Sequence, residues 1–176
     1  MKIGVVSDTH RNIEYLNQVV KWLLQKHKIS TLYHLGDDYE DVAGLSETYI
    51  DIVQVPGLYH PQYKDNSLPR KIMESVLGLQ VLLVHSTDAD LNESDSTAAD
   101  IILCGHTHVA ELKFEGSHLL FNPGHLKGDK DKNHPPTFGL LDIQDRTVAA
   151  TIFNLQFAPV QKMELMRSES GLHKMS

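Results

Sequence analysis

The segment Ile101-Ile102-Leu103-Cys104-Gly105-His106-Thr107-His108 is an apolar run that stops at a glycine and is followed by histidines at alternate positions. Short apolar runs that begin with β-branched residues predict buried strands. The two imidazoles should therefore stand at the carboxyl end of a strand, which is the edge of an open α/β sheet where ligands bind. By itself, His-x-His is a weak sign of a metal site, because loop histidines are commonly solvated.

Three other predicted strands are followed by similar side chains. An aspartate after a single strand is usually a turn residue or a helix cap. That explanation loses force when it must hold independently at four strand ends. The carboxyl ends of parallel strands lie at one edge of a sheet, so these side chains can converge, and metal binding explains the pattern better. The six candidate metal ligands are Asp8, His10, Asp37, His85, His106 and His108.

The rest of the chain predicts an α/β domain. A strand over residues 2–6, a helix from the Asn12 cap to about Lys26 and a strand over 29–35 predict a right-handed crossover with parallel strands. A weaker helical stretch over 39–47 and a third strand over 51–55 follow. Further ranges predict hairpins or loops. We expect residues 1–155 to form one domain and residues 156–176 to form a poorly ordered tail. The hairpins are 70–77 with 79–84, 113–115 with 118–121, and 137–143 with 147–155; the loops are 61–69, 87–96 and 127–136.

Composition sets further limits. With 41% hydrophobic and 22% charged residues in 176, the chain fits a soluble globular domain. A net charge of −7 disfavours a diffuse basic surface that would bind duplex nucleic acid. The apolar runs are too short to cross a bilayer, and Ser7 interrupts the first one before it resembles a signal peptide, which predicts a cytoplasmic location without membrane contact. A single cysteine, Cys104, excludes an internal disulfide and is expected to be a small buried hydrophobic residue.

Several other motifs carry little weight. Four carboxylates between residues 88 and 95 could suggest a calcium loop, but the spacing and central glycine of an EF-hand are missing, which favours a solvated loop. The glycine-rich nucleotide-binding patterns G-x-x-x-x-G-K-[ST] and G-x-G-x-x-G do not occur, and neither does the G-x-S-x-G nucleophile motif of serine hydrolases.

The ordered set Asp8-x-His10, Gly36-Asp37, Gly57, His85 and Gly105-His106-x-His108 resembles the calcineurin-like metallophosphoesterases. Within that superfamily it is most similar to the small single-domain phosphodiesterases of bacteria and archaea. The resemblance covers roughly the first 145 residues, including the Asn122-Pro123-Gly124 turn. It implies a fold of two mixed β-sheets flanked by helices, an αββα sandwich.

The resemblance also implies a site. One divalent cation would be held by Asp8, His10 and His108, and a second by His85 and His106, with Asp37 bridging both. Mixed nitrogen and oxygen ligands suit Mn²⁺, the preferred candidate, and also Fe, Ni, Co or Zn. A water shared by two cations would be the nucleophile that attacks a small phosphoester, with a diester preferred over a monoester. The oligomeric state stays open, with a homo-oligomer among the alternatives.

Two positions depart from the family pattern. The family places Asn after the glycine of the third strand, as a ligand of the second metal, whereas this chain has Leu58 in Gly57-Leu58-Tyr59-His60. The second metal site is therefore expected to be weaker. His60 is a candidate to supply a ligand or to protonate the leaving group, since imidazole titrates near neutral pH. Tyr59 and Tyr63 are candidates to line a substrate pocket.

The second departure follows the Asn122-Pro123-Gly124 turn, where the usual arginine is missing; His125, Lys127 or His134 could take its place.

Two functions remain in competition. The first is a two-metal phosphodiesterase, which the six ligands favour. The second is a protein-binding scaffold with an impaired metal centre, like the retromer subunit of the same fold, which Leu58 favours.

Overall fold

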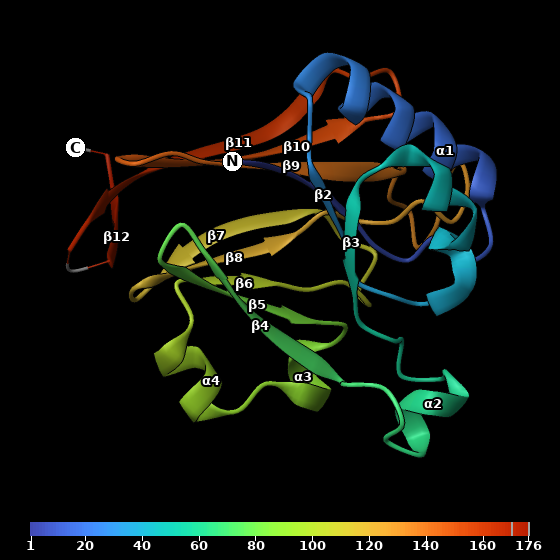
Figure 1. Cartoon of the computed structure of the whole chain (residues 1–176), viewed down its shortest axis with the longest axis horizontal. Helices are drawn as coiled ribbons and strands as arrows, with labels where there is room; N and C mark the ends of the chain where they lie inside the picture. The colour runs from blue at the N-terminus through green and yellow to red at the C-terminus, as the bar shows by residue number, and fades with distance from the viewer. Residues whose placement is uncertain (170, 176) are drawn as a thin grey trace.

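Two β-sheets packed face to face form the centre of the computed structural model, which describes residues 1–169 and 171–175 (Figure 1). The larger sheet runs, in spatial order, β12 (Gly171–Lys174), β11 (Pro159–Ser168), β10 (Thr147–Asn154), β9 (Thr137–Ile143), β1 (Lys2–Val6), β2 (Thr31–His34) and β3 (Asp51–Gln54). The smaller sheet runs β4 (Lys71–Val76), β5 (Leu79–Val84), β6 (Ile101–Leu103), β8 (His118–Asn122) and β7 (Glu111–Glu115).

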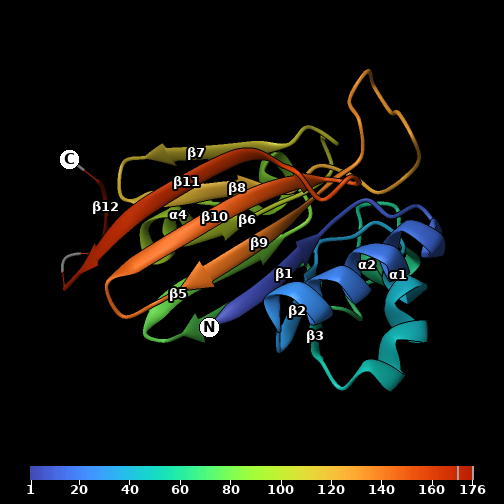
Figure 2. The same ribbon diagram turned by 90° about the horizontal axis from the view of Figure 1, so that it is seen from above.

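Helices cover the outer face of each sheet. Helix α1 (Ile13–Trp22) continues as a π-helical turn over Leu23–His27 and lies on the larger sheet near β1 and β2 (Figure 2). The short helices α3 (Thr87–Asp90) and α4 (Glu93–Ala98) lie beneath the smaller sheet (Figure 1). The predicted αββα sandwich of mixed sheets is confirmed.

The alternation of side chains along the central strands builds this layering. In β1, Val5 packs between the two sheets, whereas Val6 packs under α1. In β5, Leu83 faces the core between the sheets and Leu82 joins a smaller cluster on the opposite face. Successive strand residues point to opposite faces, and here both faces are covered, which explains why these strands are continuous apolar runs. Cys104 is buried in the smaller cluster, as expected.

Parallel pairing in both sheets positions the candidate ligands. In the larger sheet β1 pairs in parallel with β2, and β2 with β3. In the smaller sheet β5 pairs in parallel with β6, and β6 with β8. The segments that follow these strands meet at one end of the sandwich, where Gly105 N donates to the carbonyl oxygen of His85 at 3.0 Å. The predicted crossover and the three predicted hairpins are confirmed.

Residues 156–169 and 171–175 differ from the poorly ordered tail that the sequence predicted over 156–176. Strand β11 pairs along β10, and β12 pairs with β11, so both extend the larger sheet. The prediction was wrong because most β11 side chains are exposed, with Leu165 buried, so the strand has little apolar periodicity. Backbone hydrogen bonding to β10, which the sequence pattern does not report, holds it in the sheet.

Two segments predicted as loops contain short helices. Helix α2 (Pro61–Lys64) is capped by His60, and α4 begins with a capping box in which Asn92 and Asp95 bond each other's backbone N–H groups. Asp95 also forms an ion pair with Lys71. Asp90 accepts a hydrogen bond from the hydroxyl of Tyr63. Two of the four clustered carboxylates therefore have structural partners, consistent with the absence of an EF-hand pattern.

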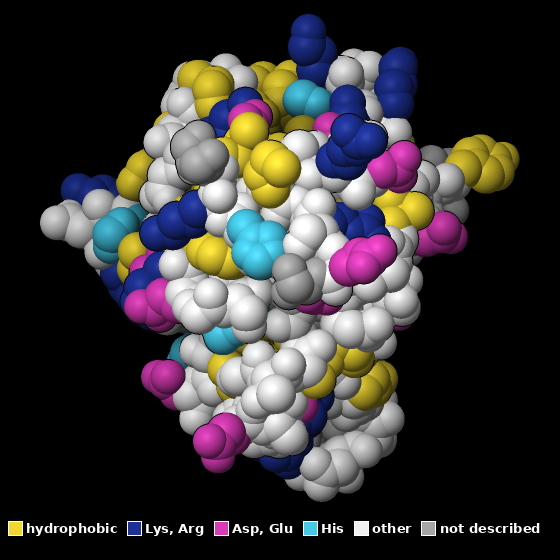
Figure 3. Space-filling model, turned by 90° about the vertical axis from the view of Figure 1, so that its left-hand side faces the viewer, with side chains coloured by type: hydrophobic (Ala, Val, Ile, Leu, Met, Phe, Trp, Pro, Cys, Tyr) yellow, Lys and Arg dark blue, Asp and Glu magenta, His cyan; other side chains and the backbone are white. Residues whose placement is uncertain are grey.

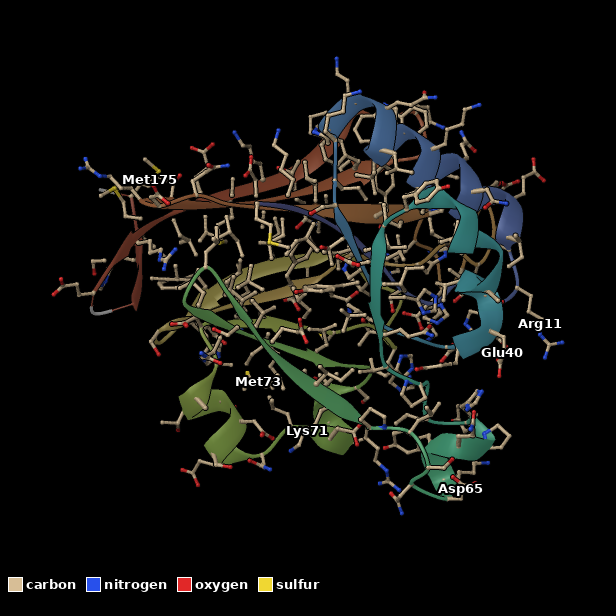
Figure 4. The ribbon with its side chains drawn as sticks, in the orientation of Figure 1. Arg11, Glu40, Asp65, Lys71, Met73 and Met175 are labelled. Atoms are coloured by element: carbon tan, nitrogen blue, oxygen red, sulfur yellow. The ribbon has the colours of Figure 1, made fainter. Side chains whose placement is uncertain are left out.

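The weaker helical stretch predicted over 39–47 is a 3₁₀ helix over Tyr39–Thr48, which follows Asp38. On the end of the molecule near β12, basic, acidic and hydrophobic side chains are interspersed (Figure 3). The labelled Arg11 and Glu40 lie at the other end, beside the loops that follow β1 and β2 (Figure 4). Among the described residues, none of the helices combines the length and the apolar character needed to cross a membrane.

Candidate metal centre

Four of the six predicted ligands meet at the end of the sandwich. Asp8 and His10 follow β1, Asp37 follows β2 and His108 follows β6. Each offers one nitrogen or oxygen atom, and these atoms all lie within 4.8 Å of one another. Residues 98 positions apart are thereby in contact, with His10 Nε2 3.3 Å from His108 Nε2. The convergence that the strand ends predicted is present.

Asp37 connects this cluster to the remaining two histidines. Its Oδ2 is 2.7 Å from His10 Nε2, and its Oδ1 is 2.9 Å from His85 Nε2. The ring of His106 stands edge-on to the ring of His85, with 5.1 Å between the ring centroids. One carboxylate thus lies between an imidazole of each predicted metal site.

The other ring nitrogen of His85 shows which way its lone pair points. His85 Nδ1 is 2.6 Å from the carbonyl oxygen of Leu35, an acceptor, so Nδ1 carries the hydrogen. In the neutral ring, Nε2 then presents a lone pair toward Asp37. This buried Nε2 has no hydrogen-bond partner in the described protein, although it is close to Asp37 Oδ1. Two acceptors that face each other in this way fit a cation bound between them.

His108 and Asp8 show the same arrangement. His108 Nδ1 is 2.6 Å from Asp131 Oδ2, so Nε2 is the free nitrogen, 3.2 Å from Asp8 Oδ1. Ser7 Oγ and the backbone N–H of His106 both donate to the other oxygen of Asp8. Asp8 Oδ1 is buried and has no hydrogen-bond partner among the described residues. The residues present therefore fit a bound divalent cation.

The pKa shifts of the clustered side chains also fit a bound cation. The contact with Asp37 raises the pKa of His10. Burial opposes a charge on His85, but Asp37 and Asp8 outweigh it and raise the pKa of His85 above its ordinary value. Burial also disfavours the charged form of Asp37, yet His10 and His85 lower the pKa of Asp37 well below its usual range. The negative surroundings that stabilise a proton on these imidazoles would equally stabilise a metal cation.

The backbone at these positions is unusual. Four ligand candidates have positive φ angles: 51° at Asp8, 46° at His10, 67° at His106 and 66° at His108. Residues other than glycine seldom adopt this left-handed conformation, which persists where the surrounding structure enforces it and is enriched at functional sites. Here it occurs at Asp8 and His10 after β1 and at His106 and His108 after β6, where candidate ligands meet.

Glycines provide the space for the carboxylates. A Cβ atom on Gly105 would lie 2.7 Å from Asp8 Oδ2, and one on Gly57 would lie 2.5 Å from Asp37 Oδ1. Gly36 has a φ of +92°, and a Cβ there would lie 2.5 Å from His85 Nδ1. These three glycines belong to the sequence motifs because larger side chains would displace the groups of the cluster.

A cavity of about 640 Å³ opens beside the cluster. Its lining includes His10 and Asp37 together with Arg11, Tyr59 and His60. His60 Nε2 is 2.9 Å from Glu40 Oε1, and its Nδ1 accepts a hydrogen bond from the N–H of Gln62 at the start of α2. Both nitrogens are in use, so this conformation does not offer His60 as a metal ligand.

The other candidates from the sequence divide between the cavity and the interior. Tyr59 is 77% exposed and lines the cavity, whereas Tyr63 is buried, with its hydroxyl donating to Asp90. His125 is fully buried against the ring of His108, where it has no access to a phosphate group. Lys127 forms an ion pair with Asp131 at 2.9 Å.

Two acidic partners of the histidines do not follow from any sequence pattern. Asp131 lies in the segment 127–136 that the sequence predicted to be a mobile surface loop, yet it contacts His108 and bridges to His134. Glu40, the partner of His60, lies in the weakly helical stretch after β2. Neither follows a strand end or a recognised motif, and only their contacts with histidines reveal them.

Comparison with known proteins places this geometry in a family. A family model described as the calcineurin-like phosphoesterase superfamily domain matches residues 1–146, most of the chain. The chain belongs to the calcineurin-like phosphoesterase superfamily. The resemblance predicted from the strand-end residues is confirmed. Members of this superfamily are metal-dependent phosphoesterases, which agrees with the metal-binding cluster.

Several relatives align with most of the chain. A phosphodiesterase from Methanocaldococcus jannaschii is 23% identical over 161 residues, which cover 83% of this chain and 95% of the relative. The Escherichia coli phosphoesterase YfcE aligns with a TM-score of 0.68 and 19% identity, over 93% of this chain and 98% of YfcE. Vps29 from Entamoeba histolytica in complex with Zn²⁺ aligns with a TM-score of 0.68 and 21% identity, over 94% and 99%.

Proposed function

We propose that this protein is a two-metal phosphodiesterase that hydrolyses a small phosphodiester. The observation that carries the proposal is the meeting of carboxylate oxygens and free imidazole nitrogens beside an open cavity. The phosphodiesterase from Methanocaldococcus jannaschii supports the diester as substrate. The cavity volume of about 640 Å³ suits a small or short substrate rather than a duplex.

The proposed ligands fall into two groups that share Asp37. Asp8, His10 and His108 would hold one cation, and His85 and His106 the other. When bound, two such cations neutralise charge on a phosphoryl group and lower the pKa of bound water. Ligand chemistry allows Mn²⁺, which we prefer, as well as Fe, Ni, Co and Zn.

The residues of this chain have defined tasks in the proposed reaction. Asp37 offsets the repulsion between the cations and holds His10 and His85 in place through contacts of 2.7 and 2.9 Å. Arg11, at the rim of the cavity, places a guanidinium near the incoming phosphate. We propose that His60, which lines the same cavity, delivers a proton to the leaving alkoxide. For this step the ring must be an imidazolium whose Nε2–H turns from Glu40 to the leaving oxygen, and the transfer leaves His60 neutral.

Metal analysis combined with an activity assay tests the proposal. The purified protein should bind up to two transition-metal ions per chain and hydrolyse bis(p-nitrophenyl) phosphate when Mn²⁺ is added. Hydrolysis of p-nitrophenyl phosphate, the matching monoester, should be slower. Protein that contains metal but is inactive on both esters with Mn²⁺, Ni²⁺, Co²⁺ and Zn²⁺ would contradict the enzymatic function.

A scaffold function is the second candidate. Leu58 removes an expected oxygen ligand of the second cation, and the similarity to Vps29 extends over nearly the whole chain. Metal-free protein that is inert in the assay would favour this alternative. The six ligand candidates favour the enzyme, because a scaffold has no need for a complete set.

Leu58→Asn should raise the metal content of the protein toward two ions per chain, because it restores an amide oxygen where the family has one. Elemental analysis after dialysis against a limiting Mn²⁺ concentration measures the change. Leu77→Asn, at a position that is 50% exposed on the β4–β5 turn, is the matched control and should leave the metal content unchanged. An unchanged content in Leu58→Asn would mean that this side chain does not reach the second site.

His60→Asn should slow hydrolysis of an alkyl phosphodiester by about 10²-fold and that of the p-nitrophenyl diester by less than about 10-fold. The reason is that p-nitrophenoxide leaves without a proton, whereas an alkoxide needs one. The measurement is kcat for the two substrates in the wild type and the variant. Equal losses for both substrates would assign His60 a structural role as the cap of α2 instead.

A further inference from the structure

The segment between Lys127 and Pro136 lies against the metal cluster through one acidic side chain. Asp131 Oδ2 is 2.6 Å from His108 Nδ1, and Asp131 Oδ1 is 2.9 Å from Lys127 Nζ. The backbone N–H of Asp131 donates to the carbonyl oxygen of His134 at 3.0 Å. Both carboxylate oxygens and the backbone of Asp131 are therefore engaged, which leaves the side chain little freedom to turn away from His108.

Additional contacts anchor the same segment to the rest of the fold. Asn12 Nδ2 donates to the carbonyl oxygen of Lys127 at 3.3 Å, and the hydroxyl of Tyr15 bonds Asp129. His125, buried beside the His108 ring, bonds the carbonyl oxygen of His134 at 3.1 Å. The segment is thus attached to α1 on one side and to His108 on the other.

The contact between Asp131 and His108 determines which nitrogen of the ring is free. A carboxylate accepts hydrogen bonds, so His108 Nδ1 carries the hydrogen and Nε2 keeps its lone pair. That lone pair faces Asp8 Oδ1 at 3.2 Å and His10 Nε2 at 3.3 Å. Without the carboxylate, the hydrogen could move to Nε2, and the ring could rotate out of the cluster. A histidine in either state is a poorer ligand.

We propose that Asp131 is a positioning residue that fixes the ring orientation and the tautomer of His108 for metal binding. This inference rests on the metal-binding part of the proposed function. Carboxylates that hold the second nitrogen of a ligating histidine typically contribute 10- to 100-fold to metal affinity. The effect of Asp131 on the cation held with Asp8 and His10 should fall in that range.

The experiment compares Mn²⁺ affinities of the full-length protein, measured by the loss of the free Mn²⁺ signal in electron paramagnetic resonance titrations. Asp131→Ala should weaken the affinity by 10- to 100-fold. Asp131→Asn, whose amide oxygen still accepts from His108 Nδ1, should weaken it by less. Asp129→Asn is the matched control, because Asp129 lies in the same segment and bonds Tyr15, and its affinity should equal that of the wild type.

A second measurement separates ring orientation from general loosening of the segment. In metal-free protein labelled with ¹⁵N-histidine at pH 8, the His108 signals should report a hydrogen on Nδ1 in the wild type and in Asp129→Asn. In Asp131→Ala they should shift toward the Nε2–H form. A variant that merely unfolded the segment would also lower the melting temperature, so thermal unfolding is recorded for all three variants.

The outcomes distinguish this inference from the proposed activity. Wild-type protein that binds Mn²⁺ without hydrolysing any phosphoester refutes the activity and leaves the role of Asp131 intact. Asp131→Ala with wild-type affinity and an unchanged His108 tautomer overturns the role of Asp131, whatever the activity. Wild-type protein that binds no divalent metal overturns both.

Discussion

Asp37→Asn should lower kcat/KM for an aryl phosphodiester by about 10³-fold, equivalent to about 4 kcal/mol of lost transition-state stabilisation. The carboxylate lies between His10 and His85, at 2.7 and 2.9 Å, and in the proposed two-metal site it would bridge the cations. An amide of the same shape keeps one acceptor oxygen but loses the negative charge that offsets the repulsion between the cations. The metal content should fall below that of the wild type at the same time.

The assay for Asp37→Asn needs steady-state kinetics with saturating Mn²⁺, together with elemental analysis of the dialysed protein. Asp65→Asn is the matched control, because Asp65 is exposed and accepts a hydrogen bond from the N–H of Ser67 at the end of α2, away from the cluster (Figure 4). It should retain wild-type activity. A loss of less than about 10-fold in Asp37→Asn would mean that this carboxylate does not bridge the metals.

Burial of His34 should make the stability of the metal-free protein depend on pH. Its free energy of unfolding should fall by up to about 3 kcal/mol as the pH decreases from about 6.5 to 4. His34 is completely buried at the end of β2, and burial lowers its pKa to about 4. Between the ordinary value of 6.5 and this value, the unfolded chain binds a proton that the folded protein does not. Protonation therefore favours unfolding in this window, and the contribution is fully present above it.

Protonation of His34 would disturb a buried network of hydrogen bonds beneath the metal cluster. His34 Nε2 lies 3.1 Å from Thr9 Oγ1, and Thr9 donates to Asp41, which also accepts from the backbone N–H of Arg11. This buried chain of contacts supports the loop that carries Asp8 and His10. Acid unfolding should accordingly begin beneath the metal cluster.

Urea unfolding at a series of pH values measures the effect of His34. The difference between wild type and His34→Gln isolates this residue, because the other histidines titrate in both proteins. Stability of His34→Gln should decrease less between pH 6.5 and 4 than that of the wild type. Identical pH dependence in the two proteins would show that His34 does not remain neutral in the folded state.

The family, the parallel strands and the convergence of the ligand candidates could be predicted from the chain alone. The strands β1, β2, β5 and β6 are covered on both faces and are therefore continuous apolar runs, and each is followed by Asp or His side chains of a type that binds metals. Glycines 36, 57 and 105 lie at those ends because a side chain there would collide with Asp8, Asp37 or His85. Signals of this kind are local, since each depends on a few adjacent residues.

The poorly ordered tail was predicted wrongly for a physical reason. Most side chains of β11 are exposed, so hydrophobic periodicity does not mark the strand, and its stability in the sheet comes from backbone pairing with β10. Backbone hydrogen bonds can form with almost any sequence, and only the partner strand reveals them.

The amino-acid sequence by itself determined which side chains are available to bind metal and at which strand ends they stand. The tertiary structure alone decided how each is oriented: which nitrogen of His85 and His108 is free, that Asp131 holds one of them, and that His60 is engaged with Glu40. These contacts join residues 20 to 50 positions apart, and their geometry depends on the packing of loops that carry no periodic pattern. Orientation is a property of the folded chain, because hydrogen-bond direction is set in space and not by spacing along the sequence.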